Sequence, residues 1–308
     1  MGCRLSTVYI RFSAHGLDVP RRSPWFERLL LHADPAVRTP GWRGEAFQVI
    51  APGTPLPPVA GAALAAAGGA PGEWSCIASP VHCVAGMTAV TLPRNGCLTL
   101  EPEEAGALAF GFNRTFTGAG PRLIVGRGAV MICTFAQALE VETHDPQAVA
   151  GGDVFGFQPV GRDAPRMRRL MSEMEMWLFE HEINRARGAA GRLPITGLWL
   201  WGQGAVPAAP PMLTGWTAGR DSLFAAFGDA AEFPSPAVAG VLVSEDTPGS
   251  DAWPEVERRW LAPAAAALRA GRLRRLEFCA GDLRVRVSRG PHFRIWRRPR
   301  PWWEHFSG

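Results

Sequence analysis

Residues 181–204 read HEINRARGAAGRLPITGLWLWGQG, and this segment joins the polar end of a helix to an apolar strand. Spacings of three and four residues place His181, Asn184 and Arg185 near one another on the surface of a helix. The glycines that follow end the helix. The segment therefore predicts a cluster of polar side chains directly before a strand.

A short apolar run follows this cluster. Residues 197–201, GLWLW, alternate leucine with tryptophan. Such a run is typical of a strand that is buried on both faces, and it predicts a position in the interior of a sheet. Gly202, Gln203 and Gly204 come next, where the strand runs out into a loop. Ligands of open α/β sheets bind at the carboxyl ends of strands, so this turn is a candidate binding site.

A long helix is predicted before this segment. Asp163 is a suitable cap and Pro165 a suitable first-turn residue. Apolar residues then recur at helical spacing, at Met167, Leu170, Met171, Met174 and Leu178. We interpret this stripe as core. Carboxylates on the same helix beside His181 would allow acid/base chemistry, or they would form a solvated face.

The composition is that of a soluble globular protein. The chain has 308 residues, of which 47% are hydrophobic and 19% charged, enough for a large core in one or two domains. The net charge of +4 is only a slight surplus and does not indicate a nucleic-acid binder. Six cysteines without a CxxC pair fit a reduced compartment. No segment is apolar enough to span a bilayer, and we expect a cytoplasmic protein.

Segments with helix and strand patterns alternate along the whole chain, which predicts an α/β fold. A stretch rich in glycine and small residues at 145–156 is the expected boundary between two halves. We expect an amino-terminal part of the core at 1–73 and a smaller α/β lobe at 74–150. The carboxyl-terminal part of the core should follow at 151–308, ending in a tail rich in arginine and tryptophan.

The segment 181–204 resembles the HPxN-xxR-xxxGxxPAxxIWxWGQG signature of the archaeal-type cofactor-independent phosphoglycerate mutases, which are metal-dependent members of the alkaline phosphatase superfamily. The match is long. The positions that agree are Asn184, Arg187, Pro194, Trp199, Trp201, Gly202, Gln203 and Gly204.

Upstream segments resemble the same family in order and spacing. They are CIASPVHC at 76–83, LEPEEA at 100–105, Gly120–Arg122 and the His144–Asp145 step. The chain most resembles a bacterial offshoot, the RpfE-type regulatory protein family, which has a tail similar to FRIWRR at 293–298. The resemblance implies a mixed sheet covered by helices, with a degenerate alkaline-phosphatase-like core and a smaller inserted α/β lobe.

The metal ligands that this superfamily requires lack counterparts in the sequence. Such an enzyme needs two divalent metals, held by carboxylates and histidines, to activate the nucleophile and stabilise phosphoryl charge. The amino terminus has no Asp-Gly step and only Asp18 nearby, and residues 244–251 keep carboxylates but no histidine. Ile77 and Ser79 replace the family's Arg and Asn. We therefore expect no catalytic residue, no metal and no cofactor, and a pseudoenzyme that binds a phosphorylated or acidic small molecule or a regulatory protein partner.

The expected binding site takes its donors and cations from these motifs. If an acidic ligand takes the place of the lost metals, Arg122, His144, Asn184 and Arg187 should converge in a cleft between lobes. The full set of expected ligand-binding residues is Arg122, His144, Asp145, His181, Asn184, Arg187, Gly202, Gln203 and Gly204.

Three alternatives remain open from the sequence. The first is residual mutase or phosphatase activity. The second is that Asn184 and Arg187 brace the helix end against the Gly202 loop through hydrogen bonds to the backbone. The third concerns the tail, where arginines interleave with aromatic residues and could contact nucleic acid or a membrane. We expect neither of these partners, because such a tail more commonly lays its tryptophans on an apolar strip.

Overall fold

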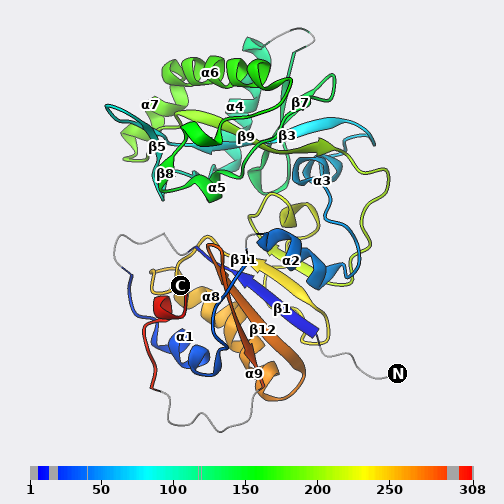
Figure 1. Ribbon diagram of the computed structural model, residues 1–308, viewed down its shortest axis with the longest axis vertical. Coiled ribbons are helices and arrows are strands. Elements are labelled where there is room, and N and C mark those ends of the chain that lie inside the picture. Colours follow the sequence, from blue (N-terminus) through cyan, green and yellow to red (C-terminus); the bar gives the residue numbers. More distant parts are fainter. Residues whose placement is uncertain are drawn as a thin grey trace. The chain divides into compact units, whose positions relative to one another are not determined.

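The computed structural model describes residues 6–13, 20–39, 41–116, 118, 120–289 and 298–306. The chain divides into two compact units. One consists of Met1–Leu56 together with Pro211–Gly308, and we call it the split unit. The other consists of Pro57–Pro210, and we call it the inserted unit. Each unit is built of a sheet and helices (Figure 1).

A six-stranded sheet forms the centre of the split unit, in the order β10-β11-β1-β12-β13-β2. Neighbours among β10, β11, β1 and β12 are parallel, whereas β13 is antiparallel to both β12 and β2. The strands are β1 (Ser6–Arg11), β2 (Val37–Arg38), β10 (Trp216–Gly219), β11 (Gly240–Val243), β12 (Leu273–Ala280) and β13 (Leu283–Ser288). The helices are α1 (Pro24–Leu29), α2 (Trp42–Ile50), α8 (Trp253–Val256) and α9 (Ala262–Arg269).

Aromatic side chains form much of the core of the split unit. The ring of Phe12 lies 5.7 Å from the rings of Phe26, Trp253 and Trp302, in edge-to-face arrangements that favour aromatic packing. Trp302 is 1% exposed, and its indole donates a hydrogen bond to the Arg21 carbonyl at 2.9 Å. This part of the tail therefore belongs to the core. Tail residues 293–297 lie outside the described residues.

A four-stranded sheet in the order β6-β7-β3-β9 forms the centre of the inserted unit, beside a small sheet in the order β4-β5-β8. The strands of the large sheet are β3 (Trp74–Val81), β6 (Arg122–Val125), β7 (Met131–Phe135) and β9 (Gly197–Ala205). Those of the small sheet are β4 (Val84–Ala85), β5 (Val90–Leu92) and β8 (Gly152–Asp153). The helices are α3 (Val59–Ala66), α4 (Pro102–Thr115), α5 (Pro146–Val149), α6 (Ala164–Glu180) and α7 (Glu182–Ala189).

Strand β9 contains the apolar run that the sequence singled out. Leu198 and Leu200 pack among core residues of α4 and α6, whereas Trp199 and Trp201 pack against residues of α3. The strand is therefore buried on both faces, as predicted. Its place in the sheet differs from the prediction, because β9 is an edge strand. Helices cover both of its faces, so a strand at the edge of the sheet is buried on both faces here.

The compact units differ from the segments 1–73, 74–150 and 151–308 expected from the sequence. The stretch 145–156 lies inside the inserted unit. The physical reason is that β9 pairs with β3 from Trp74 to Val81 and that α6 packs on β9. Long-range pairing of this kind outweighs a local run of glycines, so residues 151–210 belong with 57–150.

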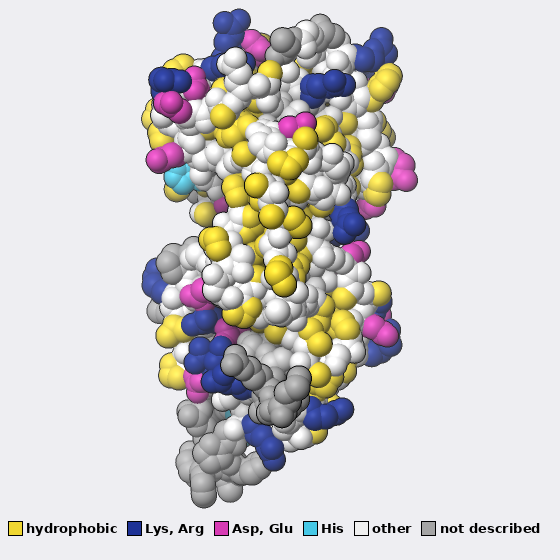
Figure 2. All heavy atoms as spheres, turned by 90° about the vertical axis from the view of Figure 1, so that its right-hand side faces the viewer, with side chains coloured by type: hydrophobic (Ala, Val, Ile, Leu, Met, Phe, Trp, Pro, Cys, Tyr) yellow, Lys and Arg dark blue, Asp and Glu magenta, His cyan; other side chains and the backbone are white. Residues whose placement is uncertain are grey.

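The predicted long helix is confirmed as α6, and its five predicted core residues are at most 9% exposed. On the face shown in Figure 2, arginines and carboxylates of the inserted unit are interspersed and are not gathered by sign. No helix among the described residues is both long enough and apolar enough to cross a bilayer. Both units are mixed α/β, with helices covering their sheets, which is the fold class that the sequence predicts.

Candidate functional site

Arg187 of α7 lies at the centre of the predicted motif and is 4% exposed. Its Nε donates a hydrogen bond to the Leu193 carbonyl at 2.7 Å, and its Nη1 donates to Oε1 of Glu104 at 2.9 Å. The Glu104 side chain is 12% exposed, so the ion pair is largely removed from water. The guanidinium therefore fastens α7 both to the chain that leads into β9 and to the start of α4.

Glu104 connects two motifs that are far apart in the sequence. Its Oε2 accepts a hydrogen bond from the Glu101 amide at 3.2 Å, in a capping box at the start of α4, and another from Arg192 at 3.1 Å. Burial alone would raise the pKa of Glu104, but these hydrogen bonds and the charges of Arg187 and Arg192 outweigh it and lower the pKa. The sequence shows the acidic first turn without its partner. A buried arginine requires a carboxylate, but only the structure shows that Arg187 is buried and that Glu104 is its partner.

Asn184 also connects helix α7 to the neighbouring chain, through hydrogen bonds of its side-chain amide. Its Nδ2 donates to the carbonyls of Leu178 and Ile195 at 2.9 and 2.8 Å, and its Oδ1 accepts from the Ile195 amide at 2.8 Å. All three partners are backbone groups. The contacts bridge the end of α6 and the chain before β9, so this side chain braces the structure as the second alternative supposes, although at Ile195 and not at the Gly202 loop.

His181 stands between α6 and α7 and caps the second of these helices. Its Nδ1 accepts a hydrogen bond from the Ile183 amide at 3.2 Å, and its ring lies 4.7 Å from the Trp177 ring. Its Nε2 would lie 3.0 Å from a Cβ built on Gly111 of α4. The imidazole is therefore packed against a helix. Burial lowers the pKa of His181, which favours the neutral ring that an accepting Nδ1 requires.

The capping role of His181 predicts a pH dependence. Because the folded pKa is lower than the ordinary value of 6.5, the unfolded chain binds the proton more readily. The stabilisation by His181 is therefore complete above pH 6.5 and is lost as the pH falls through the folded pKa. We expect urea midpoints at about pH 7.5 and about pH 5.5 to differ less in His181→Asn than in the wild type, since asparagine also caps helices. Equal differences in the two proteins would contradict the assignment.

The glycine turn forms a bulge within β9. Ser75 pairs with Gly204 and Ile77 with Trp201, so β9 has one residue more than β3 between these pairs. The bulge turns Gln203 toward the preceding chain, where Nε2 donates to the Val141 carbonyl at 2.9 Å and Oε1 accepts from the Thr143 hydroxyl. Both polar ends of Gln203 are thus engaged by the protein itself.

The remaining predicted residues lie elsewhere in the inserted unit. His144 is exposed, and its carbonyl accepts a hydrogen bond from the Trp199 indole at 2.7 Å. Asp145 caps α5 by accepting from the Gln147 amide at 2.9 Å. Arg122 is exposed on β6, at the edge of the sheet opposite β9. Two strands separate β6 from β9, so the expected convergence of Arg122 with Asn184 and Arg187 does not occur.

A cavity that the sequence did not predict lies at the carboxyl ends of β10 and β11 in the split unit. It has a volume of about 630 Å³. Its charged residues are Arg220, Asp229, Glu245, Asp246, Glu255 and Arg259. Asp246 forms a tight turn with Ser244, whose hydroxyl accepts from the Asp246 amide at 3.1 Å. The location fits the general position of ligand sites in parallel sheets. The strand GVLV followed by the acidic turn at 244–246 is the signal that could have found it.

The described side chains at this cavity do not supply the ligands for the metal pair that the resemblance implies. Among the described residues there is no group of three or more His, Cys, Asp or Glu side chains that could hold a metal ion. Asp18 lies outside the described residues. The side chains that are described therefore do not fit a two-metal phosphotransferase centre.

The described cysteines do not have the lowered pKa of a nucleophilic thiol. Cys76, Cys83, Cys97, Cys133 and Cys279 are free thiols. Burial raises the pKa of Cys97 to about 12 and also raises the pKa of Cys133. A nucleophilic cysteine requires a lowered pKa, so these side chains have the properties of core residues.

Comparison with known proteins gives partial sequence similarity to one kind of enzyme. No model of a protein family matches the chain. The chain is 38% identical over 72 residues to 2,3-bisphosphoglycerate-independent phosphoglycerate mutase 2 of Methanothermobacter thermautotrophicus, a match that covers 23% of this chain and 18% of that protein. It is 30% identical over 111 residues to the 2,3-bisphosphoglycerate-independent phosphoglycerate mutase of Methanothrix thermoacetophila, covering 35% and 27%. The matches thus span about a fifth to a quarter of the length of these relatives.

Two solved structures were also compared. A cofactor-independent phosphoglycerate mutase from Thermoplasma acidophilum gives a TM-score of 0.36 at 16% identity, over 93% of this chain and 90% of that one. The PH0037 protein from Pyrococcus horikoshii gives a TM-score of 0.40 at 12% identity, over 96% and 90%. The chain is similar in sequence to phosphoglycerate mutases over part of its length, and the mutase activity is that of the relatives.

Proposed function

We propose that this phosphoglycerate-mutase-like chain is a pseudoenzyme that acts by binding an acidic or phosphorylated small molecule and has a regulatory role. The observation that supports this most directly is that polar side chains of the motif at 181–204 bond to the chain itself. Arg187, Asn184 and Gln203 direct their polar atoms at groups of the chain itself. Side chains occupied in this way stabilise the fold and are not available to a substrate.

The carboxyl ends of the parallel strands give a second line of support. A phosphoryl group in transfer carries negative charge that metal ions or arginines must stabilise. The cavity there is lined by four carboxylates and two arginines, of which Arg259 also lies 3.7 Å from Glu255. A net negative lining opposes a phosphorylated substrate unless metal ions compensate it, and the described ligands do not form a metal site.

The family relationship, the cellular location and the kind of partner are also part of this proposal. Similarity of the tail and of the motif at 181–204 supports a place near the RpfE-type regulatory proteins, with a cytoplasmic location and a protein or small-molecule partner. The partial sequence matches to mutases are compatible with that place.

Residual mutase or phosphatase activity is the competing function, and Glu245 and Asp246 are the observation in its favour. They follow β11 after one intervening residue, Ser244, and line a cavity large enough for a metabolite. In the alternative function these carboxylates would be metal ligands together with residues that the structure does not describe. The two functions therefore predict opposite results in one assay.

We expect no turnover of 2-phosphoglycerate, 3-phosphoglycerate or p-nitrophenyl phosphate in the presence of manganese, magnesium, zinc or cobalt. The reason is the missing set of ligands for two metals. The measurement is coupled or chromogenic turnover, together with the metal content of the purified protein. Metal-dependent turnover that is lost in the double variant Glu245→Gln/Asp246→Asn, but kept in the exposed-carboxylate control Glu103→Gln, would establish residual activity and overturn the proposal.

A further inference from the structure

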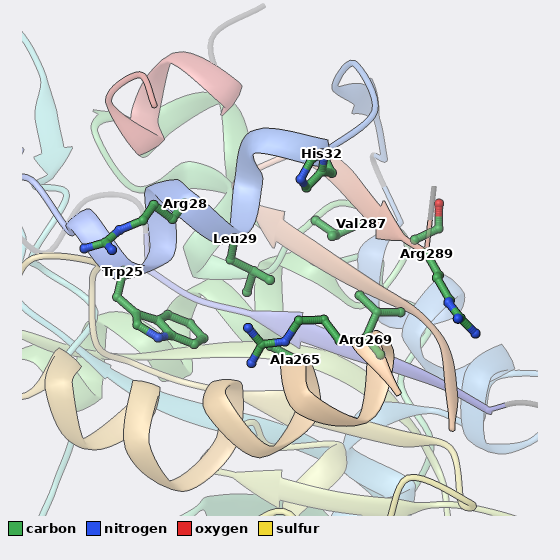
Figure 3. A pocket seen from close by; sticks show the side chains of 10 residues that line it. Trp25, Arg28, Leu29, His32, Ala265, Arg269, Val287 and Arg289 are labelled. Atoms are coloured by element: carbon green, nitrogen blue, oxygen red, sulfur yellow. The ribbon is translucent and has the colours of Figure 1, made fainter. Parts of the chain in front are cut away.

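A second cavity lies within the split unit, apart from the carboxyl ends of β10 and β11. Its volume is about 550 Å³, and α1, the short 3-10 helix Leu30–His32, α9 and the end of β13 enclose it (Figure 3). Its apolar lining consists of Trp25, Leu29, Ala265, Leu268 and Val287. Ala265, Leu268 and Val287 are buried, whereas Trp25 and Leu29 pack on the core and leave part of their surface open.

The charged residues of this cavity all carry positive or potentially positive groups. They are Arg28, His32, Arg269 and Arg289, and no carboxylate among the residues that the structure describes lines the cavity. Figure 3 shows the guanidinium of Arg269 directed toward the Trp25 indole, with Leu29 above it and Arg289 beyond Val287. The arginines are exposed, so the rim is open to a ligand from solvent.

These arginines differ from most of their neighbours in the split unit. Arg22, Arg38, Arg43 and Arg284 each form an ion pair with a carboxylate. Within the part of the chain that the structure describes, Arg28, Arg269 and Arg289 form none, and the one hydrogen bond here is from Arg28 to the Pro24 carbonyl at 3.2 Å. Cations left without acids around an apolar cavity attract an anion from solvent.

Two of the cations come from the end of α9 and from the residue after β13. Arg269 is the last residue of that helix, and Nη1 of Arg289 would lie 2.4 Å from a Cβ built on Gly271. The Arg289 guanidinium is thus near the end of α9, whereas the Arg269 guanidinium is directed toward Trp25 on the other side of the cavity (Figure 3). The carboxyl end of a helix offers about half a negative charge, which compensates only part of the charge of Arg289 and leaves that of Arg269. The remaining positive charge fits a doubly charged anion.

We propose that this cavity binds a phosphate monoester with a flat apolar body. Arg269 would hold the phosphate by charge-assisted hydrogen bonds, the positive charge of Arg289 would add to the attraction, and the body would lie against Trp25 and Leu29. The volume of about 550 Å³ is within the range of small-molecule sites and far exceeds the need of an inorganic ion. The assignment rests on the proposed function for its kind of ligand, and it adds the site and the chemistry of recognition.

Binding should be measured by calorimetry with phenyl phosphate, which has both the dianion and the flat body. Inorganic phosphate supplies the dianion alone and adenosine a flat body alone, while AMP tests whether a nucleotide is accepted. We expect phenyl phosphate to bind more tightly than inorganic phosphate and adenosine. Arg269→Ala should weaken phenyl phosphate binding roughly 10- to 100-fold, the loss of charge-assisted hydrogen bonds.

The controls separate a lost contact from a damaged fold. Arg166→Ala removes an exposed arginine of α6 and should leave affinity unchanged. Trp25→Leu should lower affinity for phenyl phosphate several-fold while leaving affinity for inorganic phosphate nearly the same. Thermal unfolding of each variant checks that the split unit is intact, and Arg269→Lys, which keeps the charge, should recover part of the affinity.

Two results would overturn the assignment. One is no binding of phenyl phosphate or AMP up to roughly 10 mM, a concentration that nearly saturates a site with a Kd of about 1 mM. The other is equal affinity in Arg269→Ala and Arg166→Ala. Neither result depends on catalysis, and phosphoglycerate turnover together with Arg269-dependent binding would instead contradict the proposed function alone.

Discussion

Arg187→Ala is expected to lower the free energy of unfolding of the inserted unit by about 3–5 kcal/mol, the usual cost of breaking a buried ion pair from one side. The variant leaves Glu104 largely buried without its main partner and removes the hydrogen bond to the Leu193 carbonyl. Urea denaturation followed by tryptophan fluorescence measures the change. The matched control is Arg185→Ala on the same helix, whose side chain is exposed and should change the free energy by less than about 0.5 kcal/mol.

A second variant distinguishes a brace from a ligand-binding residue. Replacing both partners, as in Glu104→Met/Arg187→Met, should recover much of the stability because no buried charge is left behind. If Arg187 instead binds a ligand, Arg187→Ala would keep nearly the full unfolding free energy and would lose stabilisation by phosphorylated metabolites. That pattern would contradict the bracing role.

Gly61→Ala is expected to destabilise the inserted unit by about 2–3 kcal/mol, through a clash between α3 and β9. A Cβ on Gly61 would lie 2.1 Å from the Ala205 carbonyl oxygen and 2.7 Å from its carbon, so the helix or the strand has to move. Alanine normally stabilises a helix relative to glycine by about 1 kcal/mol. The packing cost therefore has to exceed that gain, and the sign of the change is itself diagnostic.

Gly106→Ala in α4 provides the comparison for Gly61→Ala. A Cβ there meets nothing within 4 Å, so only the helix propensity acts, and stability should rise by about 0.5–1 kcal/mol. Thermal unfolding of the two variants should thus shift in opposite directions. A rise in both would mean that α3 does not approach β9 as closely as described.

The sequence predicted those features whose causes are local. The stripe from Met167 to Leu178 repeats at helical spacing and is buried along α6. The alternating run at 197–201 has the residue types of a strand that is buried on both faces, and it forms such a strand. Both patterns arise from neighbours in the chain, where periodicity is a direct consequence of backbone geometry.

The features that were missed depend on partners far along the chain. The pairing of Arg187 with Glu104 joins residues whose local patterns carry no sign of each other. The cavity that unites Trp25 and Arg269 takes residues from both ends of the sequence. Such contacts are set by topology, and a single sequence gives periodicity but not topology. The resemblance placed Arg187 at a family position, yet the bonds of its guanidinium decide what it does.

The discontinuity of the split unit has a consequence for folding. Strand β1 lies between β11 and β12, so its partners follow the whole inserted unit along the chain. During synthesis, β1 therefore has no partner strand until residues beyond Gly240 have left the ribosome. Its apolar side chains stay outside a core during that time. The inserted unit is one continuous segment and can reach its native contacts earlier. By folding first it replaces a long flexible loop with a compact body, which reduces the chain entropy that must be lost when β1 finally joins its sheet.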